Sequence, residues 1–283
     1  MVSTNTKQYL KPVSLDEAWR LMKDHGSKGK LVGGGIDVVL YGPPETEALI
    51  DVTGLGLGVI EGGKDVLGIG ATATLTELLE HPATADLHSG ILREVLVCVA
   101  SPLLRNLATV GGAVASVHPW SDVIAVLLSL DASAVCYEEG KEIEFPLEQL
   151  LENRERLHNT LIIQVRLPRA ARFAAFEKFA RTGFDVGMLN CAVSVIPDGQ
   201  VCNTVRMVFG GTPAIAKRLR SAEEHLEGKP LTESTIEETA QVAANALDVR
   251  DDLRASASYR RDLAAVGTRR CLKRVAERWS AGI

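Results

Sequence analysis

The chain has 283 residues, more than one typical domain, and its 46% share of apolar residues is enough for substantial hydrophobic cores. A net charge of −5 gives no reason to expect nucleic-acid binding, and none is predicted. No apolar run approaches the ~20 residues that a membrane-spanning helix needs, so no membrane span is expected.

The five cysteines are scattered, odd in number and without a C-x-x-C pair. Structural zinc and iron–sulfur ligation within this chain are therefore not expected, and no metal site is predicted. The N-terminal residues lack the apolar stretch of a signal peptide, and the cysteine usage fits a reduced, cytoplasmic compartment best.

The first half of the chain predicts short helices alternating with strands. Ser14 with Glu17, and Thr74 with Glu77, form capping-box patterns that each open a helix. The other expected elements are, in chain order, strand 30–32, a helical turn at 36–41, strands 48–52 and 65–71, helix 87–100, helix 121–130, a hairpin of 132–137 with 142–145, and strand 161–167.

The pattern changes after Pro168, where three β-like runs precede a helical C-terminal part. The expected elements are strands 173–180, 188–196 and 201–209, helix 217–226, a helix starting near Ser234 with Glu237 completing a capping box, and helix 256–279. We therefore predict a domain of residues 1–170 and a second domain of residues 171–283.

Two glycine-rich segments lie far apart in the chain, Gly33-Gly34-Gly35-Ile36-Asp37 and Thr109-Val110-Gly111-Gly112. Glycine lets backbone N–H groups approach a bound anion that a Cβ would obstruct. The first segment fails the G-x-G-x-x-G rule, because Val38 stands where the third glycine belongs, so alone it is more simply a tight turn. Together, the two segments suggest one long, doubly phosphorylated ligand held at two places.

Several polar residues near these segments have two interpretations. The hydroxyl of Ser116 and the carboxylates of Asp37 and Asp122 could bind a ligand, but helix capping explains either aspartate equally well. Lys178 lies in an apolar run, where a solvated edge lysine is the usual explanation. The basic residues of the last helix are most simply a solvated face, with a partner-docking face as the alternative: Arg269, Arg270, Lys273 and Arg274.

Four segments resemble one known family. They are Leu31–Asp37, similar to L-x-A-G-G-T-D; Arg105–Asp122, similar to R-N-x-A-T-I-G-G-N followed by P-x-x-D; Phe176–Asp185, similar to Y-x-K-x-x-R-x-x-x-D; and Asp251–Arg261, similar to D-D-x-R-A-S-A-x-Y-R. This combination resembles the FAD-binding medium subunits of the molybdenum hydroxylases, the xanthine dehydrogenase and carbon monoxide dehydrogenase flavoprotein family.

The resemblance implies an α+β fold. Its first part would be a two-subdomain FAD-binding domain of the p-cresol methylhydroxylase/vanillyl-alcohol oxidase type, with subdomains of about 1–54 and 55–170. Its second part would be a smaller α+β domain with a three-stranded sheet and helices.

The resemblance also implies FAD as the cofactor. The residues that it places at the cofactor are Val32, Gly33, Gly34, Gly35, Ile36, Asp37, Thr109, Gly111, Gly112, Ser116, Asp122, Ile162 and Lys178. By the family pattern, Gly33 to Asp37 and Thr109 to Gly112 hold the pyrophosphate. Asp122 contacts ribose or ribityl hydroxyls, while Lys178 approaches the carbonyl side of the isoalloxazine and Ile162 packs near the ring. No residue is assigned a catalytic role.

The implied function is that of an FAD-dependent oxidoreductase subunit. It would pass electrons from a [2Fe–2S] partner to an external acceptor such as NAD or a quinone. The implied partners are a molybdenum-cofactor large subunit and a [2Fe–2S] small subunit, in a heterotrimer that can dimerise. Ile36 replaces the family's Thr or Ser and Ala113 its Asn or Ser, so a flavin-free structural subunit stays an alternative. A non-redox nucleotide-binding protein is another.

Overall fold

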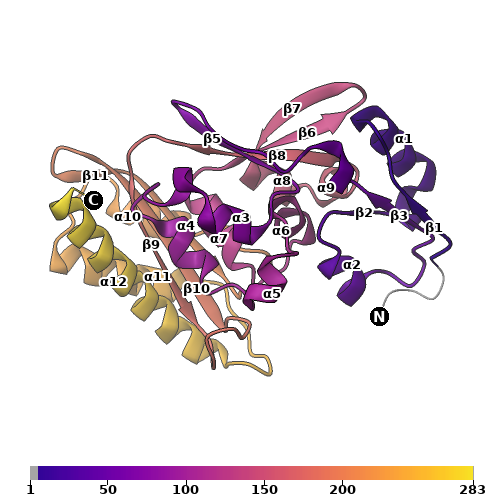
Figure 1. Ribbon diagram of the computed structural model, residues 1–283. Helices are drawn as coiled ribbons and strands as arrows, with labels where there is room; N and C mark the ends of the chain where they lie inside the picture. Colours follow the sequence, from indigo (N-terminus) through magenta and orange to yellow (C-terminus); the bar gives the residue numbers. More distant parts are fainter. Residues whose placement is uncertain (1–5, 283) are drawn as a thin grey trace. The chain divides into compact units, whose positions relative to one another are not determined.

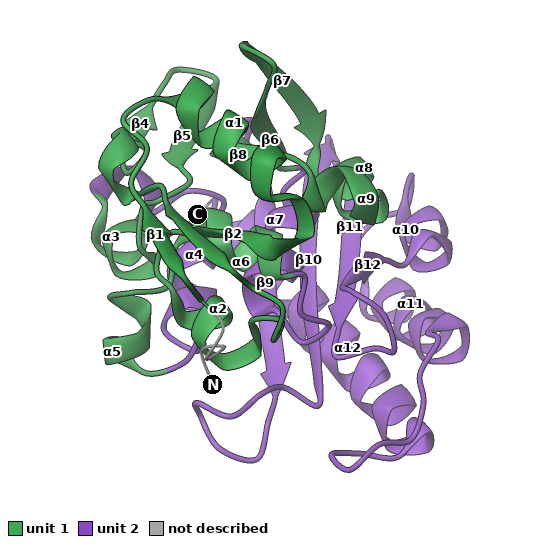
Figure 2. Ribbon diagram, turned by 90° about the vertical axis from the view of Figure 1, so that its right-hand side faces the viewer, with its two compact units in different colours: residues 1–81, 101–116, 132–168 green, residues 82–100, 117–131, 169–283 purple. Residues whose placement is uncertain are grey.

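The computed structural model describes residues 6–282, which form two compact units (Figures 1 and 2). The first unit holds residues 6–81, 101–116 and 132–168, and the second holds 82–100, 117–131 and 169–282. Both units combine helices with sheets, so the α+β class expected from the sequence is confirmed. Two stretches of the first half, 82–100 and 117–131, cluster with the C-terminal part, and the domain bounds inferred from the sequence stay a prediction.

The first unit contains two sheets. A parallel sheet of order β1-β3-β2 consists of β1 (Gln8–Leu10), β2 (Gly29–Val32) and β3 (Ala48–Asp51). An antiparallel sheet of order β4-β5-β8-β6-β7 consists of β4 (Ile60–Gly62), β5 (Val66–Gly70), β6 (Ser133–Glu138), β7 (Lys141–Pro146) and β8 (Leu161–Pro168).

The helices of the first unit are short, apart from the first. They are α1 (Leu15–His25), α2 (Ile36–Tyr41), α3 (Leu75–Glu80), α5 (Pro102–Arg105), α6 (Val110–Ser116), α8 (Leu147–Glu152) and α9 (Arg154–His158). Ser14 caps α1 by accepting a hydrogen bond from the amide of Glu17, as the sequence predicts. Ala18 of α1 is buried in one apolar cluster with Val52 and with Leu161 of β8.

The second unit is built on one antiparallel sheet of order β12-β11-β10-β9. Its strands are β9 (Phe173–Phe179), β10 (Leu189–Asp198), β11 (Val201–Gly210) and β12 (Lys217–Arg218). The three long strands correspond to the expected three-stranded sheet, and the two-residue β12 extends it beside β11.

Helices cover both faces of this sheet. They are α4 (Ile91–Leu96), α7 (Asp122–Ser129), α10 (Arg220–Leu226), α11 (Glu233–Ala246) and α12 (Ala257–Ala281). Successive residues of a strand point to opposite faces. Cys191 of β10 is therefore in the core with α12, while Asn190 and Ser194 bond to α7 on the other face (Figure 2).

Three helix predictions are wrong at their ends. The helix expected at 87–100 spans only 91–96, because His88 and Ser89 have φ of 52° and 60°, outside the helical region. The helix expected from residue 217 begins at Arg220, since Lys217 pairs with β11. The capping box expected from Ser234 and Glu237 is instead made by two threonines, Thr232 and Thr235.

Candidate functional site

The first glycine segment connects β2 to α2. Gly35 has φ of 73°, a left-handed conformation that favours glycine, and stands at the N-cap of α2. Its carbonyl oxygen accepts a hydrogen bond from the amide of Val39 at 3.0 Å, which closes the first turn of α2. Val32, at the end of β2, is half-buried.

The second glycine segment lies in the first turn of the helix α6. The hydroxyl of Thr109 accepts a hydrogen bond from the amide of Gly112 at 3.1 Å, and α6 starts at Val110. Glycine disfavours helices, but Val110 and Val114 are completely buried at helical spacing, and this apolar period overrides the propensity. Gly111 donates to the carbonyl of Ala71 at 2.8 Å, which holds the turn against the end of β5.

The structure brings the two glycine segments together within the first unit. A Cβ on Gly34 would lie 1.7 Å from the carbonyl oxygen of Leu107, closer than any side chain could be. A Cβ on Gly33 would lie 2.9 Å from the hydroxyl oxygen of Thr109. Glycine is thus required here for backbone contact between the segments.

Two other predicted residues lie on regular elements of the same unit. The Ser116 hydroxyl donates to the carbonyl of Ala113 at 3.1 Å, inside α6. Ile162 is buried in β8, where it pairs with Cys136 of β6.

Asp122 and Lys178 form a buried ion pair in the second unit. The Asp122 Oδ2 to Lys178 Nζ distance is 2.9 Å, and the side chains are 6% and 8% exposed. Lys178 also donates to the carbonyl oxygen of Cys98 at 3.0 Å. Lys178 is therefore not a solvated edge lysine, although it lies on the edge strand β9.

The pKa of Asp122 reflects a competition between burial and hydrogen bonding. Burial, the largest effect, raises this pKa above its ordinary value, while Lys178 and a hydrogen bond from Asn190 lower it. The Asn190 amide donates to Asp122 Oδ1 at 2.7 Å. Sequence reasoning missed Asn190, although a polar residue inside the apolar run of β10 is a signal for a buried hydrogen bond.

The C-terminal motif organises the chain before α12. Arg260 is 2% exposed, forms a 2.8 Å ion pair with Asp252, and donates to the carbonyl of Met188 at 2.9 Å. Ser256 caps α12 by accepting from the amide of Tyr259. In this structure these motif residues serve the fold.

The basic residues of α12 make ion pairs within the second unit. The pairs are Arg269–Glu237, Arg270–Glu177, Lys273–Glu233 and Arg274–Glu177. Arg274 also bonds to Glu94 of α4. These basic residues are therefore neutralised inside the unit, and most of their acidic partners lie on α11 and β9.

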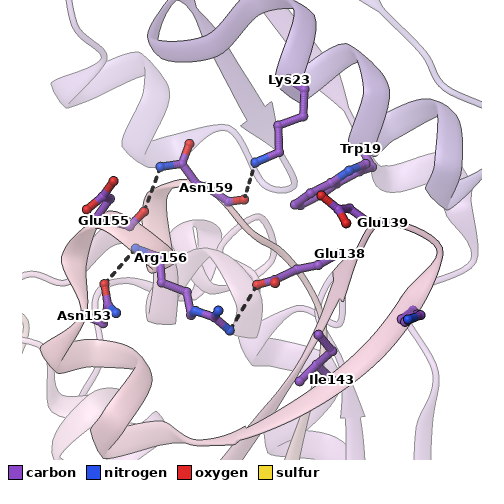
Figure 3. A pocket seen from close by; sticks show the side chains of 10 residues that line it. Trp19, Lys23, Glu138, Glu139, Ile143, Asn153, Glu155, Arg156 and Asn159 are labelled. Atoms are coloured by element: carbon purple, nitrogen blue, oxygen red, sulfur yellow. Dashed lines mark hydrogen bonds and ion pairs between the residues drawn. The ribbon is translucent and has the colours of Figure 1, made fainter.

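A surface hollow of about 700 Å³ lies on the first unit (Figure 3). Trp19 forms one wall, with the ammonium of Lys23 4.2 Å from its ring centroid. Lys23 donates to the carbonyl of Asn159 at 3.4 Å, and Arg156 pairs with Glu138 at 3.7 Å (Figure 3). These groups satisfy one another, and none of the residues placed at the cofactor lines the hollow.

Among residues 6–282, no group of three or more His, Cys, Asp or Glu side chains could hold a metal ion. No helix in the described part of the chain has the length and apolarity needed to cross a membrane.

Two family models together match nearly the whole chain. Residues 4–170 match the FAD binding domain in molybdopterin dehydrogenase, and residues 174–275 match the CO dehydrogenase flavoprotein C-terminal domain.

Curated proteins and solved structures match over similar lengths. The 6-hydroxypseudooxynicotine dehydrogenase complex subunit alpha of Paenarthrobacter nicotinovorans is 28% identical over 95% of this chain and 94% of that protein. The carbon monoxide dehydrogenase medium chain of Hydrogenophaga pseudoflava is 27% identical over 94% and 95%. A crystal structure of the Hydrogenophaga pseudoflava carbon monoxide dehydrogenase, lacking the Mo-pyranopterin moiety, matches with a TM-score of 0.89 and 25% identity, over 98% of this chain and 99% of that one.

Proposed function

Because the chain belongs to the family of FAD-binding medium subunits of molybdenum hydroxylases, we propose that it passes electrons from a [2Fe–2S] partner to an external acceptor. The resemblance found in four sequence segments is confirmed, as is the fold that it implied. FAD is the cofactor, and the chain is a subunit of an FAD-dependent oxidoreductase.

The contact between the two glycine segments is the observation that supports the FAD site best. We propose that the FAD diphosphate binds where Gly33 to Asp37 meet Thr109 to Gly112. A Cβ on Gly34 would lie only 1.7 Å from the carbonyl oxygen of Leu107, so the two segments meet through backbone atoms without side chains between them. Backbone N–H groups are suited to bind phosphate.

Lys178 is proposed to bind a carbonyl oxygen of the isoalloxazine. A lysine ammonium has three N–H donors. Within the described part of the chain, the structure gives it two acceptors, Asp122 and the carbonyl of Cys98. The third N–H is the one that we assign to the flavin. In this proposal Asp122 holds the ammonium of Lys178. The family pattern gives Asp122 a second role, at the ribose or ribityl hydroxyls.

The remaining contacts of the proposed site are supported by the fold. Val32 precedes the first glycine segment, and Ser116 ends the helix that carries the second. Ile162 would provide an apolar surface for the flavin ring.

The chemistry belongs to the cofactor, and the protein provides binding, orientation and electrostatics. When bound, FAD would accept electrons singly and release them in pairs to NAD, a quinone or another acceptor. We propose a molybdenum-cofactor large subunit and a [2Fe–2S] small subunit as partners in a heterotrimer, which can dimerise. The cytoplasmic location stays a prediction.

An absorbance spectrum of the purified chain, with and without added FAD, tests the proposal. We expect a flavin spectrum that stays with the protein after gel filtration. A chain that purifies with its partner subunits but takes up no FAD would instead be a structural subunit, and the proposal would be wrong.

A further inference from the structure

Three residues stand in one row across the sheet of the second unit. Asn190 of β10 is directly opposite Lys178 of β9 on one side and Gly210 of β11 on the other. Directly opposite residues of antiparallel strands share a face of the sheet. Asp122, the first residue of α7, lies over this face and bonds to both Asn190 and Lys178.

Gly210 leaves the space that the Asn190 side chain uses. A Cβ on Gly210 would lie 2.5 Å from the Asn190 Oδ1 atom. The next amide, of Gly211, donates to the carbonyl of Pro119 at 2.7 Å and so ties the segment before α7 to the end of β11. The backbone hydrogen bond from Gly211 to Pro119 and the side-chain hydrogen bond from Asn190 together hold Asp122 in position.

The two oxygens of Asp122 have separate donors. Asn190 bonds to Oδ1 at 2.7 Å, and Lys178 bonds to Oδ2 at 2.9 Å. Without the amide, the carboxylate could turn both oxygens toward the ammonium. Asn190 thereby fixes the angle at which Asp122 holds Lys178.

The burial of Asn190 costs free energy that a leucine of similar shape would avoid. Its side chain is completely buried, and its Oδ1 has no hydrogen-bond partner among the described residues. A buried carbonyl oxygen without a partner is destabilising. Among the described residues, the Asn190 side chain makes its hydrogen bond to Asp122, which points to a role in holding the ion pair.

We propose that Asn190 is a positioning residue, which holds Asp122 so that the ammonium of Lys178 meets the flavin carbonyl in a fixed place. The inference rests on the proposed role of Lys178. A cation beside this carbonyl favours the anionic reduced flavin. Asn190 would therefore raise the reduction potential of bound FAD without touching it.

The first test is the midpoint potential of FAD bound to the purified chain. N190L keeps the shape and removes the donor, and N190S is a smaller second variant in case N190L does not fold. We expect an equilibrium for reduction about tenfold less favourable, which is a drop of about 30 mV for a two-electron couple.

S194A is the matched control. Ser194 lies four residues along the same strand and is buried on the same face, where it donates to the carbonyl of Ser129. Its loss removes the donor to Ser129 and an acceptor of Arg172 without touching Asp122, so the potential should stay at the wild-type value. A drop in the midpoint potential of equal size in S194A and N190L would overturn the inference, because the loss of any buried hydrogen bond on this face would then lower the potential.

The second test uses the FAD-free chain. Competitive acetylation followed by peptide mass spectrometry reports the reactivity of Lys178, with the exposed Lys64 as an internal reference. N190L and N190S should raise the relative reactivity of Lys178 severalfold, and S194A should not. Wild-type FAD binding with both the potential and the reactivity unchanged in N190L would overturn only this inference. Failure of the wild-type chain to bind FAD would overturn the proposed function and this inference together.

Discussion

The ammonium of Lys178 lies 2.9 Å from the carboxylate of Asp122, and each side chain is less than one-tenth exposed. The two residues are 56 positions apart in the chain (178 − 122), and they meet because α7 packs on the face of the sheet that Lys178 shares with Asn190. A buried ion pair of this kind is costly to break, because removal of one partner leaves an uncompensated charge.

Replacement of Lys178 by methionine should destabilise the second unit. K178M leaves the Asp122 carboxylate buried without its cation, so the free energy of unfolding should fall by about 3–5 kcal/mol. Chemical denaturation of the FAD-free chain measures this change. The double variant D122N/K178M removes both charges and should be less destabilised than the sum of the two single variants. Strict additivity would show that the pair contributes no coupling.

Replacement of Gly34 by alanine should disrupt the contact between the glycine segments. The added Cβ would lie 1.7 Å from the Leu107 carbonyl oxygen, so the backbone must move. We expect a loss of at least about 1–3 kcal/mol in the free energy of unfolding, as for overpacked sites, together with loss of FAD uptake. G54A is the control, since a Cβ there meets nothing within 4 Å. Wild-type FAD uptake by G34A would contradict the proposed diphosphate site.

Removal of the Thr109 hydroxyl should weaken the start of α6. The hydroxyl accepts from the amide of Gly112 at 3.1 Å, as an N-cap side chain does. T109V should lower the free energy of unfolding by about 1 kcal/mol, whereas T109S keeps the acceptor and should stay close to the wild type. A loss in T109S as large as that in T109V would contradict this role, because T109S keeps the hydroxyl and removes only the methyl group.

The Asp252–Arg260 pair should make stability depend on acid pH. Burial raises the pKa of Asp252, but hydrogen bonds from Arg260 and from backbone amides outweigh it, so this pKa lies below its ordinary value. The folded protein therefore binds fewer protons here than the unfolded chain. The stabilisation is present above the unfolded pKa of ~3.9 and is lost as the pH falls through the folded pKa.

Thermal unfolding of D252N measures this dependence. The melting temperature of D252N should lie below that of the wild type near neutral pH, and the gap should close under acid conditions, below pH ~3.9. D198N, at the exposed end of β10, should show no gap at either pH. A gap that persists unchanged in acid would show that the carboxylate charge is not responsible.

The sequence predicted the fold well where local patterns decide it. The apolar patterns in the sequence predicted two strands and a helix that the structure contains, as β10, β11 and α12. The N-cap predicted at Ser14 is also present. Glycine pairs suggested that two distant segments meet, and Gly34 does contact Leu107. Whether these segments bind FAD stays a prediction that needs the experiments above.

The rest depends on which residues meet across elements. Glycine has a low helix propensity, which argues against a helix at Gly111. The helix forms there because Val110 and Val114 are buried in the core of the first unit. The pairing of Asn190 with Gly210 follows from strand register, which a one-residue slip would change. Neither is visible in a short stretch of sequence.

Binding of FAD compared with riboflavin by the wild-type chain tests the central claim most directly. Riboflavin keeps the isoalloxazine but lacks the diphosphate that the glycine segments are proposed to hold. Loss of two charge-assisted hydrogen bonds, about 3 kcal/mol, predicts that calorimetry will show riboflavin binding about 100-fold more weakly than FAD. Equal affinity for the two ligands would contradict the account, because the glycine segments would then contribute nothing to binding.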